Sequence, residues 1–197
     1  MFPSMEVRWF YEGTIPPEVL AWFQRGNRKP KEQSCRVDYY LRLDSDSLGI
    51  KLREGRIEVK QRHHHYGVVC FHEQVTGLMD HWWKWSFKLT KVHSNLMDVT
   101  LFPSSWIGVK KERRLWKYRL ATETEEYPER GCHVELTNIS VGEKAWWSLG
   151  FEAFGDESTI QEDLFLVIKH VLTERELPIT PTDSPAIQKQ ESSIPFP

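Results

Sequence analysis

Charged and apolar residues alternate along much of this chain, and this period of two constrains the fold more than any other feature of the sequence. Residues 48–53 and 56–62 carry basic side chains at every second position or nearly so, with Ile, Leu or Val between them. Side chains two residues apart share one face of a β-strand. The Glu54-Gly55 connection between the two stretches therefore predicts a β-hairpin.

The same pattern predicts strands over most of the chain and helices at two places. Near residue 112 the charges occupy both strand faces, because Lys110, Glu112 and Arg114 alternate with Lys111 and Arg113. A strand that is charged on both faces suits a barrel with a wet exterior and a wet interior. The predicted fold is mainly β (α+β), an antiparallel β-barrel or tunnel of about eight strands with flanking helices at 15–25 and 158–174. The predicted strands are 5–12, 34–43, 48–53, 56–62, 67–77, 81–90, 97–102, 106–120, 131–140 and 145–154.

Length and composition favour one soluble cytoplasmic domain. The 197 residues suit a β-tunnel domain over 1–177, followed by a Pro- and Ser-rich tail over 178–197 that is predicted to be disordered. A net charge of −2 argues against binding to extended nucleic acid, and no apolar run is long enough to span a membrane. The three cysteines lack disulfide or zinc-knuckle spacing, which favours a reducing compartment.

Basic residues gather on a few strands although the chain as a whole is slightly acidic. Crowded inside a barrel, these cations would repel one another unless an anion balanced them. This predicts binding of a phosphorylated small molecule or polyphosphate. The alternative is a structural or interaction β-domain without a ligand, whose charged strand faces are simply solvated. The predicted anion-binding residues are Lys51, Arg53, Lys60, Arg62, Lys111 and Arg113.

The order of short motifs along residues 5–175 resembles the CYTH superfamily of triphosphate tunnel metalloenzymes. The motifs are a Glu-containing first strand, Asp38-Tyr-Tyr-Leu41, Ile50-Lys-Leu-Arg53, Ile57-Glu-Val-Lys60, Val109-Lys-Lys-Glu-Arg113, Val134-Glu-Leu136 and Gly150-Phe-Glu152. The resemblance implies that the basic residues of these motifs hold phosphate. It also implies that Glu6, Glu135 and Glu152 hold Mg²⁺ or Mn²⁺, and that the activity is a metal-dependent triphosphatase or related phosphoryl-transfer reaction.

The first motif departs from this family. The family begins with Glu-x-Glu-x-Lys, whereas this chain has Glu6, Arg8 and Phe10 at the three positions. Loss of a carboxylate and gain of a cation weaken metal binding, on which hydrolysis depends. A catalytically reduced anion-binding barrel, or an enzyme with altered chemistry, is therefore favoured over a metal-dependent triphosphate hydrolase.

Two further motifs have competing interpretations. For His63-His-His65, a surface turn is favoured over a metal site. In the Trp-rich stretch 82–85, Trp83, Trp85, Phe87 and Leu89 share one strand face, for which core packing is favoured over stacking on bases. Trp82 and Lys84 share the other face.

Overall fold

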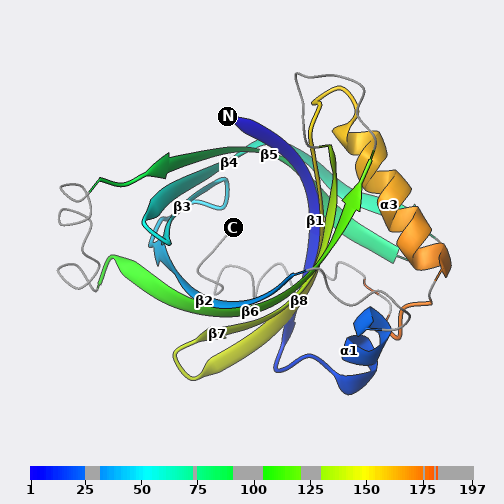
Figure 1. Cartoon of the computed structure of the whole chain (residues 1–197), viewed down its shortest axis with the longest axis horizontal. Coiled ribbons are helices and arrows are strands. Elements are labelled where there is room, and N and C mark those ends of the chain that lie inside the picture. Colours follow the sequence, from blue (N-terminus) through cyan, green and yellow to red (C-terminus); the bar gives the residue numbers. More distant parts are fainter. Residues whose placement is uncertain are drawn as a thin grey trace.

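The computed structural model describes residues 1–24, 32–72, 75–90, 104–120, 130–174, 176–179 and 181. Within these residues, eight strands form one closed antiparallel barrel in the order β1-β5-β4-β3-β2-β6-β7-β8, and two helices lie outside it (Figure 1). The strands are β1 (Phe2–Glu12), β2 (Glu32–Leu41), β3 (Leu48–Arg53), β4 (Arg56–His72), β5 (Val75–Lys88), β6 (Trp106–Arg119), β7 (Gly131–Val141) and β8 (Lys144–Phe154). The helices are α1 (Pro17–Gln24) and α3 (Ile160–Glu174).

The barrel closes because β1 pairs with both β5 and β8. Closure gives every strand two neighbours, although β2 pairs with β3 only at Tyr39 and Tyr40. The predicted fold class is thus confirmed, and both predicted helices are present with slightly shorter bounds. The predicted strand at 97–102 lies outside the described residues.

The hydrophobic core lies between the barrel wall and the two helices. On β1, Met5, Val7 and Trp9 are buried on the outer face, while Glu6 and Arg8 point into the barrel. Buried side chains of α1 and α3 cover this outer face, and α3 also contacts β8 (Figure 1). The period-two pattern therefore turns the apolar face outward, under the helices, and leaves the interior of the barrel polar.

One prediction about local structure is confirmed and another is wrong. The hairpin at Glu54-Gly55 forms, with both residues at positive φ (49° and 71°) and Arg53 opposite Arg56. The predicted turn at His63–His65 is wrong, because β4 continues without a break to His72 and its hairpin with β5 comes after that residue. Register irregularities at Arg62/His64, His65/Gly67 and Cys70/His72 let this long strand bend around the barrel.

The core prediction for one face of the Trp-rich stretch is also wrong. Phe87 is 54% exposed, and Trp83 and Trp85 are only partly buried. Trp82, on the opposite face, is 4% exposed and lies beneath the Lys60 ammonium group, whose Nζ is 4.2 Å from the ring centre. The ring that this part of β5 buries is therefore on the inner face, where a cation covers it.

The end of the chain is only partly described. Ile179 packs against the core, and the Pro181 carbonyl accepts a hydrogen bond from the Thr76 amide at 3.2 Å. The other positions of the predicted tail, apart from 178, lie outside the described residues, so the tail stays a prediction. Neither helix in the described part of the chain has the length and apolar character needed to cross a membrane.

A buried ion pair fastens α3 to the barrel, and its loss is expected to destabilise the protein. Arg130 donates two hydrogen bonds of 2.6 Å to Asp163, whose side chain is only 3% exposed. Arg130→Ala leaves that carboxylate buried without its cation, so we expect the free energy of unfolding to fall by about 1–3 kcal/mol in urea denaturation. The matched control is His170→Ala, which removes an exposed pair with Glu174 and an edge contact with the Tyr118 ring, and is expected to change stability by about 1 kcal/mol or less. Equal stability of the two variants would contradict a role for Arg130 in holding α3.

Candidate anion-binding site in the barrel interior

The barrel encloses a cavity of about 380 Å³ whose lining is dominated by charged side chains. This volume lies within the usual range for small-molecule sites. Among the described residues, eight basic and four acidic side chains line the cavity, an excess of four positive charges. The basic residues are Arg8, Arg36, Lys51, Arg53, Lys60, Lys84, Lys111 and Arg113, and the acidic residues are Glu6, Glu58, Glu135 and Glu152.

Most of the residues predicted from the sequence meet in this cavity. Five predicted anion-binding residues line it, namely Lys51, Arg53, Lys60, Lys111 and Arg113, as do the three predicted metal-binding residues Glu6, Glu135 and Glu152. The sixth, Arg62, does not line the cavity. Its guanidinium group contacts Asp46 at 2.6 Å and Asp80 at 3.8 Å. These two carboxylates compensate the charge of Arg62, which therefore does not add to the cluster of cations in the cavity.

Arg8 lies at the centre of the acidic side of the cavity. Its Nε donates to Glu6 Oε1 at 2.8 Å, and its Nη1 donates to Glu135 Oε1 at 2.8 Å and to Ser148 Oγ at 3.1 Å. Gly150 on β8 makes room for this arrangement, because a Cβ atom there would lie 2.7 Å from Arg8 Cζ. The guanidinium group thus bridges two carboxylates that come from different strands.

The cations keep the nearby carboxylates ionised. Burial alone would raise the pKa of Glu135, but Arg8 and Arg113 outweigh it and lower the pKa to about 2. Burial likewise opposes ionisation of Glu6, whereas Lys60 and Arg8 hold the pKa of Glu6 well below its usual value. Both groups are therefore negatively charged at neutral pH.

The three carboxylates do not fit a divalent metal ion in this arrangement. Glu6 is shared by Arg8 and by Lys60, whose Nζ lies 2.5 Å from Oε2. Glu135 contacts Arg8 and Arg113, and Glu152 contacts Lys84. Metal ligation requires carboxylate lone pairs that are free to face one ion. Here the protein's own cations already occupy those positions.

A second group of charges surrounds Tyr40 on the other side of the cavity. Lys111 Nζ donates to the Tyr40 hydroxyl at 2.8 Å, and Lys51 Nζ contacts Glu58 at 3.1 Å. Burial opposes ionisation of Tyr40, but Lys111 and Lys51 outweigh it and lower the pKa of the phenol. This direction indicates a locally positive potential.

Two further lining cations show the same excess of positive charge. Burial and the neighbouring Lys60 lower the pKa of Lys84 to about 7, although contacts with Glu6 and Glu152 favour its charged form. Arg113 contacts Glu32 and Glu135, yet its Nε is buried without a hydrogen-bond partner in the described part of the chain. An anion placed among these groups would favour the charged form of Lys84 and would accept a hydrogen bond from Arg113 Nε.

Arg36, Lys84 and Tyr40 line the cavity but are not among the site residues predicted from the sequence. Arg36 and Tyr40 alternate with exposed residues of β2, and Lys84 lies on the same face of β5 as Trp82. Period-two alternation was therefore the signal that could have found them. Arg8 was visible as a departure from a motif, but its bridging position depends on the register between β1 and β8.

Comparisons with known proteins do not identify a family for this chain. No family model and no curated protein matches the sequence. One similar solved structure is a conserved hypothetical protein from Pyrococcus furiosus, with a TM-score of 0.43, 12% identity, and coverage of 88% of this chain and 92% of that chain. Another is the PH1819 protein from Pyrococcus horikoshii, with a TM-score of 0.41, 13% identity, and coverage of 95% and 99% respectively.

Proposed function

We propose that this protein binds a phosphorylated small molecule or polyphosphate inside its barrel, without a metal ion. The observation that carries the proposal is a cavity of about 380 Å³ lined by eight basic and four acidic side chains. Buried Asp38, which pairs with Arg36 and Lys51, reduces the excess of positive charge from four to three. Charges held away from water interact strongly, so an uncompensated excess of one sign destabilises the folded chain. A bound polyanion removes that destabilisation, and this provides the free energy for binding.

The kinds of cation present favour phosphate over other anions. Arginine offers a planar pair of donors that matches phosphate oxygens, and lysine supplies a compact point charge. One phosphate group carries about −1.5 to −2 charges at pH 7. More than one phosphoryl group is therefore needed to balance an excess of three, which favours a diphosphate, a triphosphate or a longer chain.

The CYTH-like order of motifs supports the same ligand class, and Arg8 argues against the chemistry of that superfamily. We propose that the chain is a divergent CYTH-like protein in which a guanidinium group stands among carboxylates that would otherwise hold a metal. The contacts of Arg8 with Glu6 and Glu135 support this view. Binding is thus favoured over triphosphate hydrolysis.

Tripolyphosphate tests the proposal in two assays. At 100 times its dissociation constant, a ligand that binds only the folded state adds about 2.7 kcal/mol of stability, which corresponds to a rise of about 5–10 °C in Tm for a domain of this size. We expect this rise at low salt, together with no phosphate release with or without Mn²⁺. An unchanged Tm at saturating tripolyphosphate would contradict binding. Phosphate release that requires Mn²⁺ would instead establish a metal-dependent triphosphatase.

Binding is expected to take up a proton through Lys84. In the free barrel the pKa of this lysine is about 7, so a large part of the population is neutral at pH 8. A bound polyanion favours the charged form and raises this pKa, so the complex holds more protons than the free protein. Affinity should therefore fall as pH rises above 7. Calorimetric titration at pH 8 in buffers with different ionisation enthalpies measures the number of protons taken up.

The matched variant is Lys84→Arg, because a guanidinium group stays charged throughout this pH range. Proton exchange by the tripolyphosphate itself is common to both proteins, so the difference between them isolates Lys84. We expect lower proton uptake and a flatter pH dependence for the variant. Identical proton uptake by the two proteins would contradict a role for Lys84 in binding the anion.

A further inference from the structure

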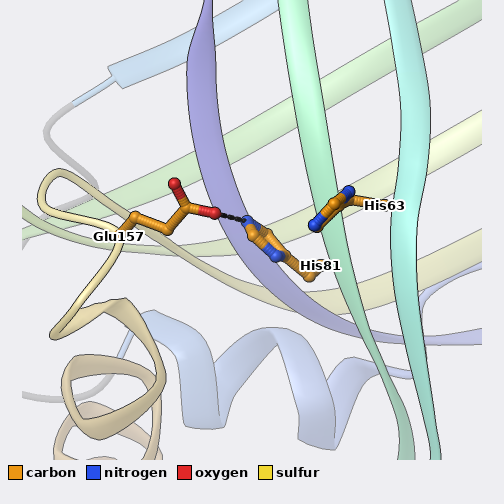
Figure 2. Close-up of side chains that lie close together, drawn as sticks. All are labelled: His63, His81 and Glu157. Atoms are coloured by element: carbon orange, nitrogen blue, oxygen red, sulfur yellow. Dashed lines mark ion pairs between the residues drawn. The ribbon is translucent and has the colours of Figure 1, made fainter.

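A second group of side chains with ligand chemistry lies on the outer face of the barrel. His63 comes from β4, His81 from β5, and Glu157 from the loop between β8 and α3, and the three side chains converge (Figure 2). Their nearest ligand atoms all lie within 4.8 Å of one another. Elements distant in sequence therefore bring two imidazoles and a carboxylate to one point, outside the cavity described above.

An irregularity in β4 positions His63. Arg62 pairs with Trp82 and His64 pairs with His81, so two β4 residues, His63 and His64, face a single residue of β5. Such β-bulges redirect side chains and often occur next to functional sites. The His63 ring also stacks on Trp83, with ring centres 4.1 Å apart and planes at 12°. The bulge and the stacking contact hold this imidazole beside His81.

His81 is buried with an unused nitrogen. The residue is 5% exposed, and its Nε2 has no hydrogen-bond partner in the described part of the chain. Glu157 Oε1 lies 3.7 Å from that nitrogen, beyond hydrogen-bonding distance but directly opposite it (Figure 2). Burial lowers the pKa of His81, which favours the neutral ring whose lone pair a metal ion requires. A buried imidazole nitrogen without a partner is costly, and a bound ion would satisfy it.

We propose that His63, His81 and Glu157 bind a divalent transition-metal ion, with Zn²⁺ as the best match. Two imidazoles and one carboxylate form a known three-residue ligand set for zinc, and a water molecule then completes the tetrahedron. His63 and Glu157 are exposed, so this fourth position faces solvent. Zinc–ligand bonds of about 2.0–2.2 Å require the three atoms to approach one another more closely. The exposed side chains of His63 and Glu157 have room for this adjustment.

Metal binding at this site would tie the β8–α3 loop to the β4–β5 hairpin. Untagged protein, stripped with a chelator and then dialysed, is titrated with Zn²⁺ by calorimetry and with Co²⁺ by visible absorption. We expect one ion per chain, a visible Co²⁺ spectrum typical of tetrahedral coordination, and a higher Tm with Zn²⁺. Each of the variants His63→Ala and Glu157→Gln is expected to weaken Zn²⁺ binding at least tenfold.

The control variant is His170→Ala, which removes an exposed histidine of α3 that contacts Glu174 and Tyr118 and is not one of the three proposed ligands. It should bind Zn²⁺ as the unmodified protein does. His63 and Glu157 are exposed, so their variants are expected to keep the Tm of the metal-free protein, and that Tm is measured alongside. Absence of Zn²⁺ binding by the unmodified protein, or equal binding by His63→Ala and His170→Ala, would overturn the proposal. Neither result would bear on polyphosphate binding inside the barrel.

Discussion

Lys111→Ala is expected to weaken tripolyphosphate binding about 10- to 100-fold. The Lys111 ammonium group lines the cavity beside Tyr40, on the side where two lysines lower the pKa of the phenol. A hydrogen bond to a charged group contributes about 1.5–3 kcal/mol, and each 1.4 kcal/mol is a factor of ten in affinity. Calorimetric titration of both proteins at the same low salt concentration measures the ratio of dissociation constants.

The neighbouring lysine offers a matched control. Lys110 has the same chemistry one position away, but its side chain is 54% exposed on the outer face and pairs with Glu112. Lys110→Ala should therefore bind tripolyphosphate with nearly unchanged affinity. Equal losses in the two variants would point to a nonspecific effect of overall charge and would contradict binding inside the barrel.

Arg8→Gln is expected to cost about 3–5 kcal/mol of folding stability. Arg8 donates charge-assisted hydrogen bonds to both Glu6 and Glu135, and each such bond contributes about 1.5–3 kcal/mol. Among the described residues, after the substitution Glu6 keeps only Lys60 and Glu135 keeps only Arg113 as a cationic partner. Urea denaturation at pH 7 measures the loss. The difference from the unmodified protein should shrink as pH falls toward 4, because carboxylates freed from Arg8 protonate more readily and no longer require a cation.

Arg42→Gln is the control for this variant, since Arg42 is exposed near the end of β2 and its loss should change stability by about 0.5 kcal/mol or less. A further variant, Arg8→Glu, places a third carboxylate beside Glu6 and Glu135. We expect it to be less stable than Arg8→Gln in chelator and to regain stability when Mn²⁺ is added. If Arg8→Gln is as stable as the unmodified protein, Arg8 does not compensate these carboxylates.

Period-two alternation predicted the barrel and most of the cavity lining, because alternation decides which side of the wall each side chain faces. Lys51, Lys60 and Lys111 were found in this way without knowledge of strand order, whereas Glu135 was named only through the resemblance to the CYTH superfamily. The same rule extended to β2 and β5 would have found Arg36 and Lys84. What alternation cannot supply is which strands are neighbours, and therefore which cation meets which carboxylate.

The features that sequence analysis missed depend on register. Arg62 lies on a strand rich in cations, but Asp46 and Asp80 reach it only because of how β3, β4 and β5 align. The run of three histidines was interpreted as a turn because a bulge has no reliable sequence signal. Glu157 is far along the chain from His81, so only the folded structure brings these two residues together.

Crystals of the protein grown with tripolyphosphate test the central claim most directly. The proposal predicts electron density for the anion inside the barrel, with its oxygens in contact with Lys51, Lys111 and Arg113. A saturated crystal in which the anion lies only on the outer surface, with water alone among those three side chains, would contradict it.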